Sequence, residues 1–163
     1  MKKGKEGKFH LGLLTLCFVL VILVAVLGYF FTNTNVNSAW YDAIKPDLAP
    51  PSFVFPIVWS FLFFTMALSL YLCLNKKENE RMVLIAFSVN FLLNVVWSFL
   101  FFYLKNPVAA FFELILLWIS IIFMIFVAYR TNKIAAYILL PYFFWVAFAG
   151  ALNYISAFLI IVV

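Results

Sequence analysis

The chain contains five apolar runs, each long enough to cross a lipid bilayer. They cover residues 11–31, 53–74, 82–104, 107–129 and 134–160, and about 20 helical residues span the roughly 30 Å of hydrocarbon in a bilayer. Of all 163 residues, 68% are hydrophobic and only 10% are charged, which excludes a soluble globular domain. Because irregular backbone cannot face lipid, the sequence predicts an all-α integral membrane protein, one domain over residues 1–163 built as a bundle of five transmembrane helices.

The basic residues of the loops predict the orientation of this bundle. If the spans alternate in direction, Lys45 and Lys105 fall on one side of the membrane. The other side receives nine basic residues: Lys2, Lys3, Lys5, Lys8, Lys76, Lys77, Arg81, Arg130 and Lys133. The positive-inside rule then predicts a cytoplasmic N-terminus and an outer C-terminus in the cell (plasma) membrane. The net charge of +5 follows from this topology, so we predict no nucleic acid partner.

The first run could be mistaken for a signal peptide, since it follows a Lys-rich start. Its length of about 20 residues exceeds that of the apolar part of a signal peptide, and the following NVNSAW is a poor cleavage site. We therefore predict that it is retained as a membrane anchor.

The loop between the first two runs, residues 32–52, is here called the lid segment, and we predict that it lies on the outer face. Four of the six prolines lie in it or just after it: Pro46, Pro50, Pro51 and Pro56. This long, Pro- and Trp-rich loop therefore cannot be one regular helix. Ser52 is predicted to cap the next helix, with Pro56 near its first turn. Trp40 and Tyr41 belong either to an interfacial aromatic belt or to a cap over a flat apolar ligand.

Three of the runs carry aromatic and carboxamide side chains at helical spacing. The matching faces consist of Phe55, Trp59, Phe63 and Met66 in the second run, Asn90, Asn94, Trp97 and Phe101 in the third, and Tyr142, Trp145, Ala149 and Asn153 in the fifth. Three such faces can enclose a cavity with flat aromatic walls and a carboxamide floor. The alternative for Asn90 and Asn153 is a hydrogen bond that joins neighbouring helices.

Other residues in the fifth run concern packing. The spacing from Ala147 to Ala151 predicts a close approach of another backbone, and Pro141 is expected to end a first turn or to kink the helix.

The remaining polar residues offer little conventional chemistry. Glu113 is the only acid within a run; it is either a functional group, as a proton relay or ligand partner, or an interfacial residue that snorkels to the nearby outer surface. His10 precedes the first run, so we predict no metal site and no His-ligated haem. Cys17 and Cys73 are expected to be inert buried thiols. No nucleophile and base pair is evident, which disfavours an ordinary hydrolase or transferase.

Three motifs carry a resemblance to a known family. The first is Trp40-Tyr41-x-x-x-Lys45-Pro46-x-x-x-Pro50-Pro51, followed by Val54-Phe55-Pro56-x-Val58-Trp59. The others are Leu93-Asn94-x-x-Trp97-Ser98-x-Leu100-Phe101-Phe102 and Leu140-Pro141-Tyr142-x-x-Trp145-x-x-Phe148-Ala149-x-x-Leu152-Asn153. In order and spacing they resemble the tryptophan-rich sensory protein and translocator protein family (TspO/MBR, also called peripheral benzodiazepine receptor). The similarity covers nearly the whole chain.

This resemblance implies a five-helix membrane receptor or sensor, often a homodimer, that binds porphyrins and similar flat apolar molecules. No obligatory cofactor is implied; porphyrin or haem would be the ligand. The implied ligand-binding residues are Trp40, Tyr41, Pro51, Phe55, Trp59, Asn94, Trp97, Trp145, Phe148, Ala149 and Leu152. Two further functions stay open: light-dependent breakdown of protoporphyrin, which would involve Trp59 and Trp145, and transport of a tetrapyrrole.

The chain also departs from the family pattern. Leu48 stands where the family usually has a Trp between the KP and PP pairs, so the lid segment has one ring fewer. No Lys or Arg follows Tyr154, so the sterol-consensus motif of some relatives is absent from the end of the fifth run, and we do not predict cholesterol binding.

Overall fold

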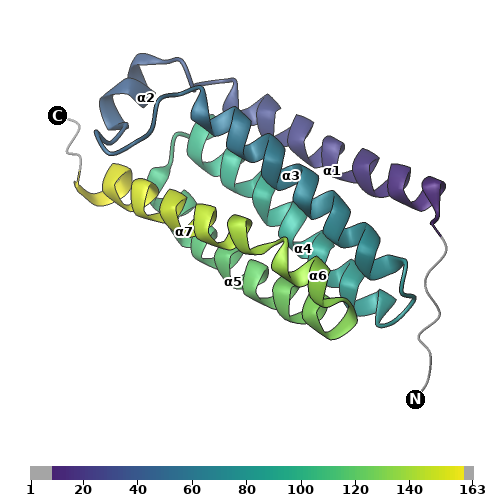
Figure 1. Cartoon of the computed structure of the whole chain (residues 1–163). Helices are drawn as coiled ribbons and strands as arrows, with labels where there is room; N and C mark the ends of the chain where they lie inside the picture. Colours follow the sequence, from purple (N-terminus) through teal and green to yellow (C-terminus); the bar gives the residue numbers. More distant parts are fainter. Residues whose placement is uncertain (1–8, 160–163) are drawn as a thin grey trace.

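The computed structural model describes residues 9–159, and over this range the chain forms a bundle of long helices (Figure 1). The helices are α1 (Leu11–Thr32), α2 (Ala39–Ile44), α3 (Val54–Leu74), α4 (Glu80–Ser98), α5 (Pro107–Thr131), α6 (Lys133–Tyr137) and α7 (Leu140–Tyr154). Two segments with wider turns, η1 (Phe99–Tyr103) and η2 (Ile155–Leu159), continue α4 and α7. Five continuous stretches are long and apolar enough to cross a membrane, which confirms the predicted fold class. Residue 160, predicted to end the fifth span, lies outside the described residues.

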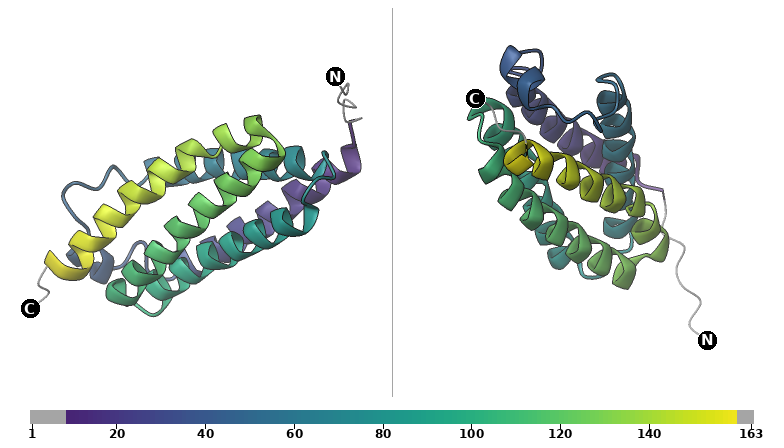
Figure 2. Two further views of the ribbon diagram at one scale, coloured as in Figure 1. Left: turned by 90° about the horizontal axis from the view of Figure 1, so that it is seen from below. Right: turned by 90° about the vertical axis from the view of Figure 1, so that its left-hand side faces the viewer.

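The helices follow a fixed order around the bundle. α1 packs against α3 and α4, α4 packs against α5, and α5 packs against α7 (Figure 2). α3 also meets α6, where the Ser69 hydroxyl donates a hydrogen bond to the Ala135 carbonyl at 2.9 Å. The backbones of α3 and α7 approach one another least among these neighbours. That side of the bundle is closed mainly by side chains, and we call it the α3/α7 seam.

The lid segment contains one short helix. Residues 39–44 form the short helix α2, which contains no proline. Ser38 caps it, because its hydroxyl accepts a hydrogen bond from the Tyr41 amide at 3.3 Å. This short helix agrees with the prediction that residues 32–52 do not form one regular helix. The prolines act later in the segment, where the chain crosses to α3.

Two details of the helix ends also differ from the prediction. Ser52 does not cap α3, since the residue that precedes this helix is Phe53 and it makes no side-chain cap. Instead the Ser52 hydroxyl accepts a hydrogen bond from the Lys45 ammonium at 3.4 Å. Pro56 lies in the first turn of α3, as predicted.

The fifth span is broken near Pro141, which confirms the predicted interruption. Ile138 and Leu139 separate α6 from α7, and Pro141 is the second residue of α7, where its missing N–H costs little. Asn132 caps the start of α6, because its side-chain oxygen accepts a hydrogen bond from the Ile134 amide at 3.0 Å. The span therefore consists of two consecutive helices, α6 and α7, and the segment η2.

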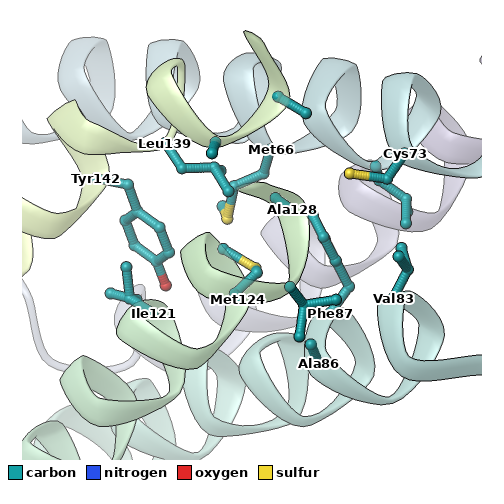
Figure 3. Packing of buried hydrophobic residues seen from close by; sticks show 14 of the residues in the cluster. Met66, Cys73, Val83, Ala86, Phe87, Ile121, Met124, Ala128, Leu139 and Tyr142 are labelled. Atoms are coloured by element: carbon teal, nitrogen blue, oxygen red, sulfur yellow. The ribbon is translucent and has the colours of Figure 1, made fainter. Parts of the chain in front are cut away.

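The main hydrophobic core fills the bundle from its middle to the basic end, the end that carries the loops after α3 and α5. Figure 3 shows its close packing around Met66, Phe87, Ile121, Met124 and Tyr142, which come from α3, α4, α5 and α7. Cys17 and Cys73 are both buried and unpaired, as predicted. A second, smaller cluster lies at the opposite end beneath α2 and consists of Ile44, Phe101, Phe102 and Ala110. Among the predicted ligand-binding residues, Trp59, Trp145 and Ala149 pack against the main core, Trp40 and Tyr41 pack against the smaller cluster, and Trp97 packs against both.

Candidate ligand-binding site

Tyr142 of α7 is fully buried and contacts residues of α3 and α4. The Asn94 amide of α4 donates a hydrogen bond to its hydroxyl oxygen at 2.6 Å, and the Tyr142 hydroxyl donates to the Asn90 carbonyl oxygen at 3.2 Å. The edge of the Trp59 ring of α3 faces the Tyr142 ring, with centroids 6.2 Å apart. Trp59 and Asn94 therefore both contact Tyr142, from α3 and from α4. Tyr142 was on the predicted face of the fifth run but not among the predicted ligand-binding residues.

Asn90 extends this network toward α5. Its amide donates to the Ser120 hydroxyl at 2.9 Å, and Ser120 donates to the Leu117 carbonyl at 2.6 Å. Buried polar groups are stable when they are paired in this way. Asn90 therefore joins helices, as one of its two interpretations proposed, while among the described residues the Asn94 amide bonds only to the Tyr142 hydroxyl.

Trp97 connects the centre of the bundle to the cluster beneath α2. Its indole N–H donates to the Asn153 carbonyl oxygen at 3.1 Å, and the Asn153 amide donates to the Pro107 carbonyl at 2.8 Å. The Trp97 ring stacks on Phe101 at 5.2 Å between centroids. Both polar ends of Asn153 are thus used between helices, which agrees with its packing interpretation.

The aromatic residues of the lid segment pack on η1. Trp40 lies against Phe101 at 5.9 Å, and Tyr41 lies against Phe102 at 5.4 Å. Their ring contacts are with Phe101 and Phe102 and do not include Trp59 or Trp145. Burial, and secondarily the charge of Asp42, raises the pKa of the Tyr41 phenol.

The rest of the lid segment covers less. Pro51 is exposed, and the Leu48 side chain, which replaces a family Trp, is 65% exposed. The departure from the family pattern therefore falls at the surface of the lid segment.

The α3/α7 seam contains an apolar groove of about 430 Å³. It is lined by Val58, Phe61 and Leu62 of α3 and by Pro141, Phe144, Trp145 and Phe148 of α7. The Trp145 ring lies 5.8 Å from Phe55 across the seam and 5.6 Å from Phe148 on its own helix. The Trp145 indole N–H is buried and has no hydrogen-bond partner among the described residues. This donor is available to an acceptor that is not part of the chain.

The small residues of α7 lie in two environments. Ala149 packs against the main core, and Leu152 is buried. The close approach of α5 occurs at Gly150, where an added Cβ would lie 3.0 Å from the Leu114 side chain. Ala147 and Ala151 are exposed, so the close approach predicted for them does not occur between the described helices.

Glu113 lies inside the bundle, so the interpretation of a snorkelling side chain is wrong. Its side chain is on the buried face of α5, with Ala110, Leu117 and Ser120, and it is only 7% exposed. Neither carboxyl oxygen has a hydrogen-bond partner in the described part of the chain. Within residues 9–159 no group of three or more His, Cys, Asp and Glu could hold a metal ion. The interior therefore offers ring faces, a carboxamide and unpaired polar atoms.

Comparisons with known proteins agree with this arrangement. The model of the TspO/MBR family matches residues 17–158. The chain is 34% identical to the tryptophan-rich protein TspO of Chlorobaculum tepidum, over 86% of this chain and 91% of the relative. It is 36% identical to the protein of the same name from Archaeoglobus fulgidus, over 82% and 88%, and 32% identical to protein CrtK of Rhodobacter capsulatus, over 88% and 90%. With five apolar spans and a family match over most of its length, the chain is a multi-pass membrane protein that belongs to the TspO/MBR family.

Proposed function

We propose that this protein is a membrane receptor that binds a porphyrin, or a similar flat apolar molecule, among the aromatic side chains of α3, α4 and α7. Trp59, Asn94 and Trp97 form the inner part of the site, and Trp145 and Phe148 form the part that faces the bilayer. Ligand sites of this kind combine apolar walls with a few polar groups that fix orientation. Membership of the TspO/MBR family supports the same class of ligand.

The observation that carries the proposal is the state of Trp145. It lines the groove of the α3/α7 seam, and its N–H is buried without an acceptor. A buried donor without a partner destabilises the protein by about 1–3 kcal/mol. A ligand with carbonyl or carboxylate oxygens would supply the missing acceptor while its apolar surface contacts Phe55 and Phe148. The same ring can therefore recognise both the flat body and the polar edge of one molecule.

The ligand enters from the bilayer in this proposal. The groove opens between α3 and α7, where Phe61 and Phe144 are 53% and 65% exposed and face the lipid. Porphyrins partition into membranes because they are flat and largely apolar. Entry through the seam then requires the rings to separate, while the polar network around Tyr142 holds α4, α5 and α7 together.

The test is a titration of purified protein in lipid nanodiscs with protoporphyrin, followed by the quenching of tryptophan fluorescence. The wild type is expected to saturate. Trp145→Phe removes the N–H, and Ala149→Phe fills space beside Trp145; each is expected to raise Kd about tenfold, which corresponds to about 1.4 kcal/mol. Trp118→Phe is the matched control, because the Trp118 N–H already donates to the Phe143 carbonyl at 3.2 Å and its ring does not line the groove.

Two results would contradict the proposal. One is a wild type whose fluorescence does not saturate with protoporphyrin. The other is a Kd that is unchanged in both Trp145→Phe and Ala149→Phe, which would remove the assigned site even if the protein binds porphyrin elsewhere.

A further inference from the structure

A second groove lies at the basic end of the bundle, on a different side from the α3/α7 seam. Its volume is about 430 Å³, and it is formed by the start of α4 and the end of α5. Its lining consists of Asn79, Met82, Phe123, Phe126, Val127 and Arg130. The site proposed for porphyrin shares none of these residues.

The polarity of this groove changes along the helix axis. Arg130 and Asn79 lie at the ends of α5 and α4, where the chain leaves the apolar spans. Phe123 lies seven residues before Arg130 in α5, which places it about 10 Å deeper along the helix at 1.5 Å per residue. The groove is therefore charged at the end near the membrane surface and apolar deeper in the bundle. A phospholipid in a bilayer has the same order, with its phosphate at the surface and its acyl chains inside.

The positive charge of Arg130, at the surface end of the groove, is held in position and is unpaired. The Arg130 guanidinium lies 5.0 Å from the centre of the Phe126 ring, a cation–π contact that fixes it over the groove. Among residues 9–159 no carboxylate oxygen lies within 4.0 Å of a Lys or Arg nitrogen, so Arg130 forms no ion pair there. A planar guanidinium binds phosphate oxygens through two parallel hydrogen bonds.

Lys133 provides a useful contrast at the same end of the bundle. Its ammonium lies 5.5 Å from the centre of the Tyr129 ring, and neither residue lines the groove. Two cations with similar aromatic partners are thus only three residues apart, and one of them belongs to the groove.

We propose that this groove binds an anionic phospholipid. The phosphate accepts hydrogen bonds from Arg130, and an acyl chain lies along Met82, Phe123 and Phe126. A net negative headgroup is preferred because Arg130 has no acidic partner, whereas a zwitterionic headgroup brings its own cation to the same place. The proposal does not depend on porphyrin binding.

The test is native mass spectrometry of the purified protein with phosphatidylglycerol or phosphatidylcholine of identical acyl chains. The wild type is expected to retain phosphatidylglycerol with about tenfold preference, a difference of about 1.4 kcal/mol. Arg130→Ala is expected to reduce this preference at least fivefold, and Arg130→Lys to reduce it partly, because a point charge replaces the planar donor. Lys133→Ala is the matched control and should leave the preference unchanged.

A second pair of variants tests the apolar part. Met82→Trp fills the groove from α4 and should weaken retention of phosphatidylglycerol, whereas Leu84→Trp, at a lipid-exposed position outside the groove, should not. The proposal is overturned if Arg130→Ala and Lys133→Ala reduce the preference equally, since the cause would then be diffuse positive charge. It is also overturned if inorganic phosphate or glycerol phosphate displaces the lipid at equal concentration, because the acyl chain would then contribute nothing.

Discussion

At the scale of single residues, the buried polar side chains divide into those with partners and those without. Asn90, Asn94 and Tyr142 satisfy one another, while Glu113 and the Trp145 N–H have no partner in the described chain. In an apolar interior, paired groups stabilise one arrangement and unpaired groups destabilise it. The paired side chains therefore hold the bundle together. The unpaired groups are the places where a bound ligand or proton would change the stability of the bundle most.

Removing the Tyr142 hydroxyl tests the paired set. Tyr142→Phe leaves the Asn94 amide and the Asn90 carbonyl oxygen without their partner, so we expect a loss of about 1–3 kcal/mol in the free energy of unfolding. The free energy of unfolding is measured by unfolding the protein in mixed micelles with increasing SDS. Tyr137→Phe is the control, because the Tyr137 side chain is 57% exposed. Equal effects of the two substitutions would show that the buried hydrogen bonds contribute no more than a surface hydroxyl.

At the scale of elements, α2 is fastened to η1 by aromatic contacts and one buried aliphatic side chain. Ile44 is 3% exposed. The Trp40 ring packs on Phe101, and the Tyr41 ring packs on Phe102. The Asn35 amide also donates to the Phe102 carbonyl at 2.9 Å. The lid segment is therefore attached to the α4 side of the bundle and leaves the α3/α7 seam uncovered by its rings.

The raised pKa of Tyr41 makes this attachment sensitive to alkaline pH. The ordinary pKa of tyrosine is about 10, and the folded state binds the phenolic proton more tightly than the unfolded lid does. The resulting stabilisation is fully present below about pH 10 and is lost as the pH rises through the raised value. A spin label at Leu48→Cys should therefore become more mobile above about pH 10. Tyr41→Phe should abolish this transition, and Tyr103→Phe should retain it; a transition that persists in Tyr41→Phe would assign it to another group.

The sequence predicted some of these elements and not others, for physical reasons. The spans were predictable because their apolar length alone determines them, and the inward direction of Asn94 and Trp97 followed from helical spacing. The place where α2 docks was not predictable, since it depends on two adjacent side chains, Phe101 and Phe102, both turning inward. The wider turns of η1 allow this, with the Leu104 amide bonded to the Phe99 carbonyl five residues earlier at 2.9 Å. No residue type in the sequence predicts such a wider helical turn.

At the scale of the whole molecule, the two ends of the bundle differ in charge, and this asymmetry predicts its orientation. The described loops and helix ends on one side carry Lys76, Lys77, Arg81, Arg130 and Lys133, and those on the other carry Lys45 and Lys105. The positive-inside rule places the first side in the cytoplasm. α2 and the rest of the lid segment would then face outward.

Thiol labelling tests this orientation. A membrane-impermeant maleimide should label Asp47→Cys on intact cells and should label Lys77→Cys only after permeabilisation. The native Cys17 and Cys73 are 0% exposed and serve as the unlabelled background. The reverse pattern would invert the topology and would place the lid segment in the cytoplasm.

The α3/α7 seam has a consequence for how the bundle moves. It is closed by ring contacts such as those of Phe55 with Trp145 and Trp59 with Tyr142. In water, parting these rings would expose them to solvent, but acyl chains are as apolar as the rings and can take their place. Separation of the rings then loses close packing contacts but exposes no apolar surface to water. Fluid acyl chains thus make it easier for α3 and α7 to separate, and a stiffer or more ordered bilayer would slow the opening of the α3/α7 seam.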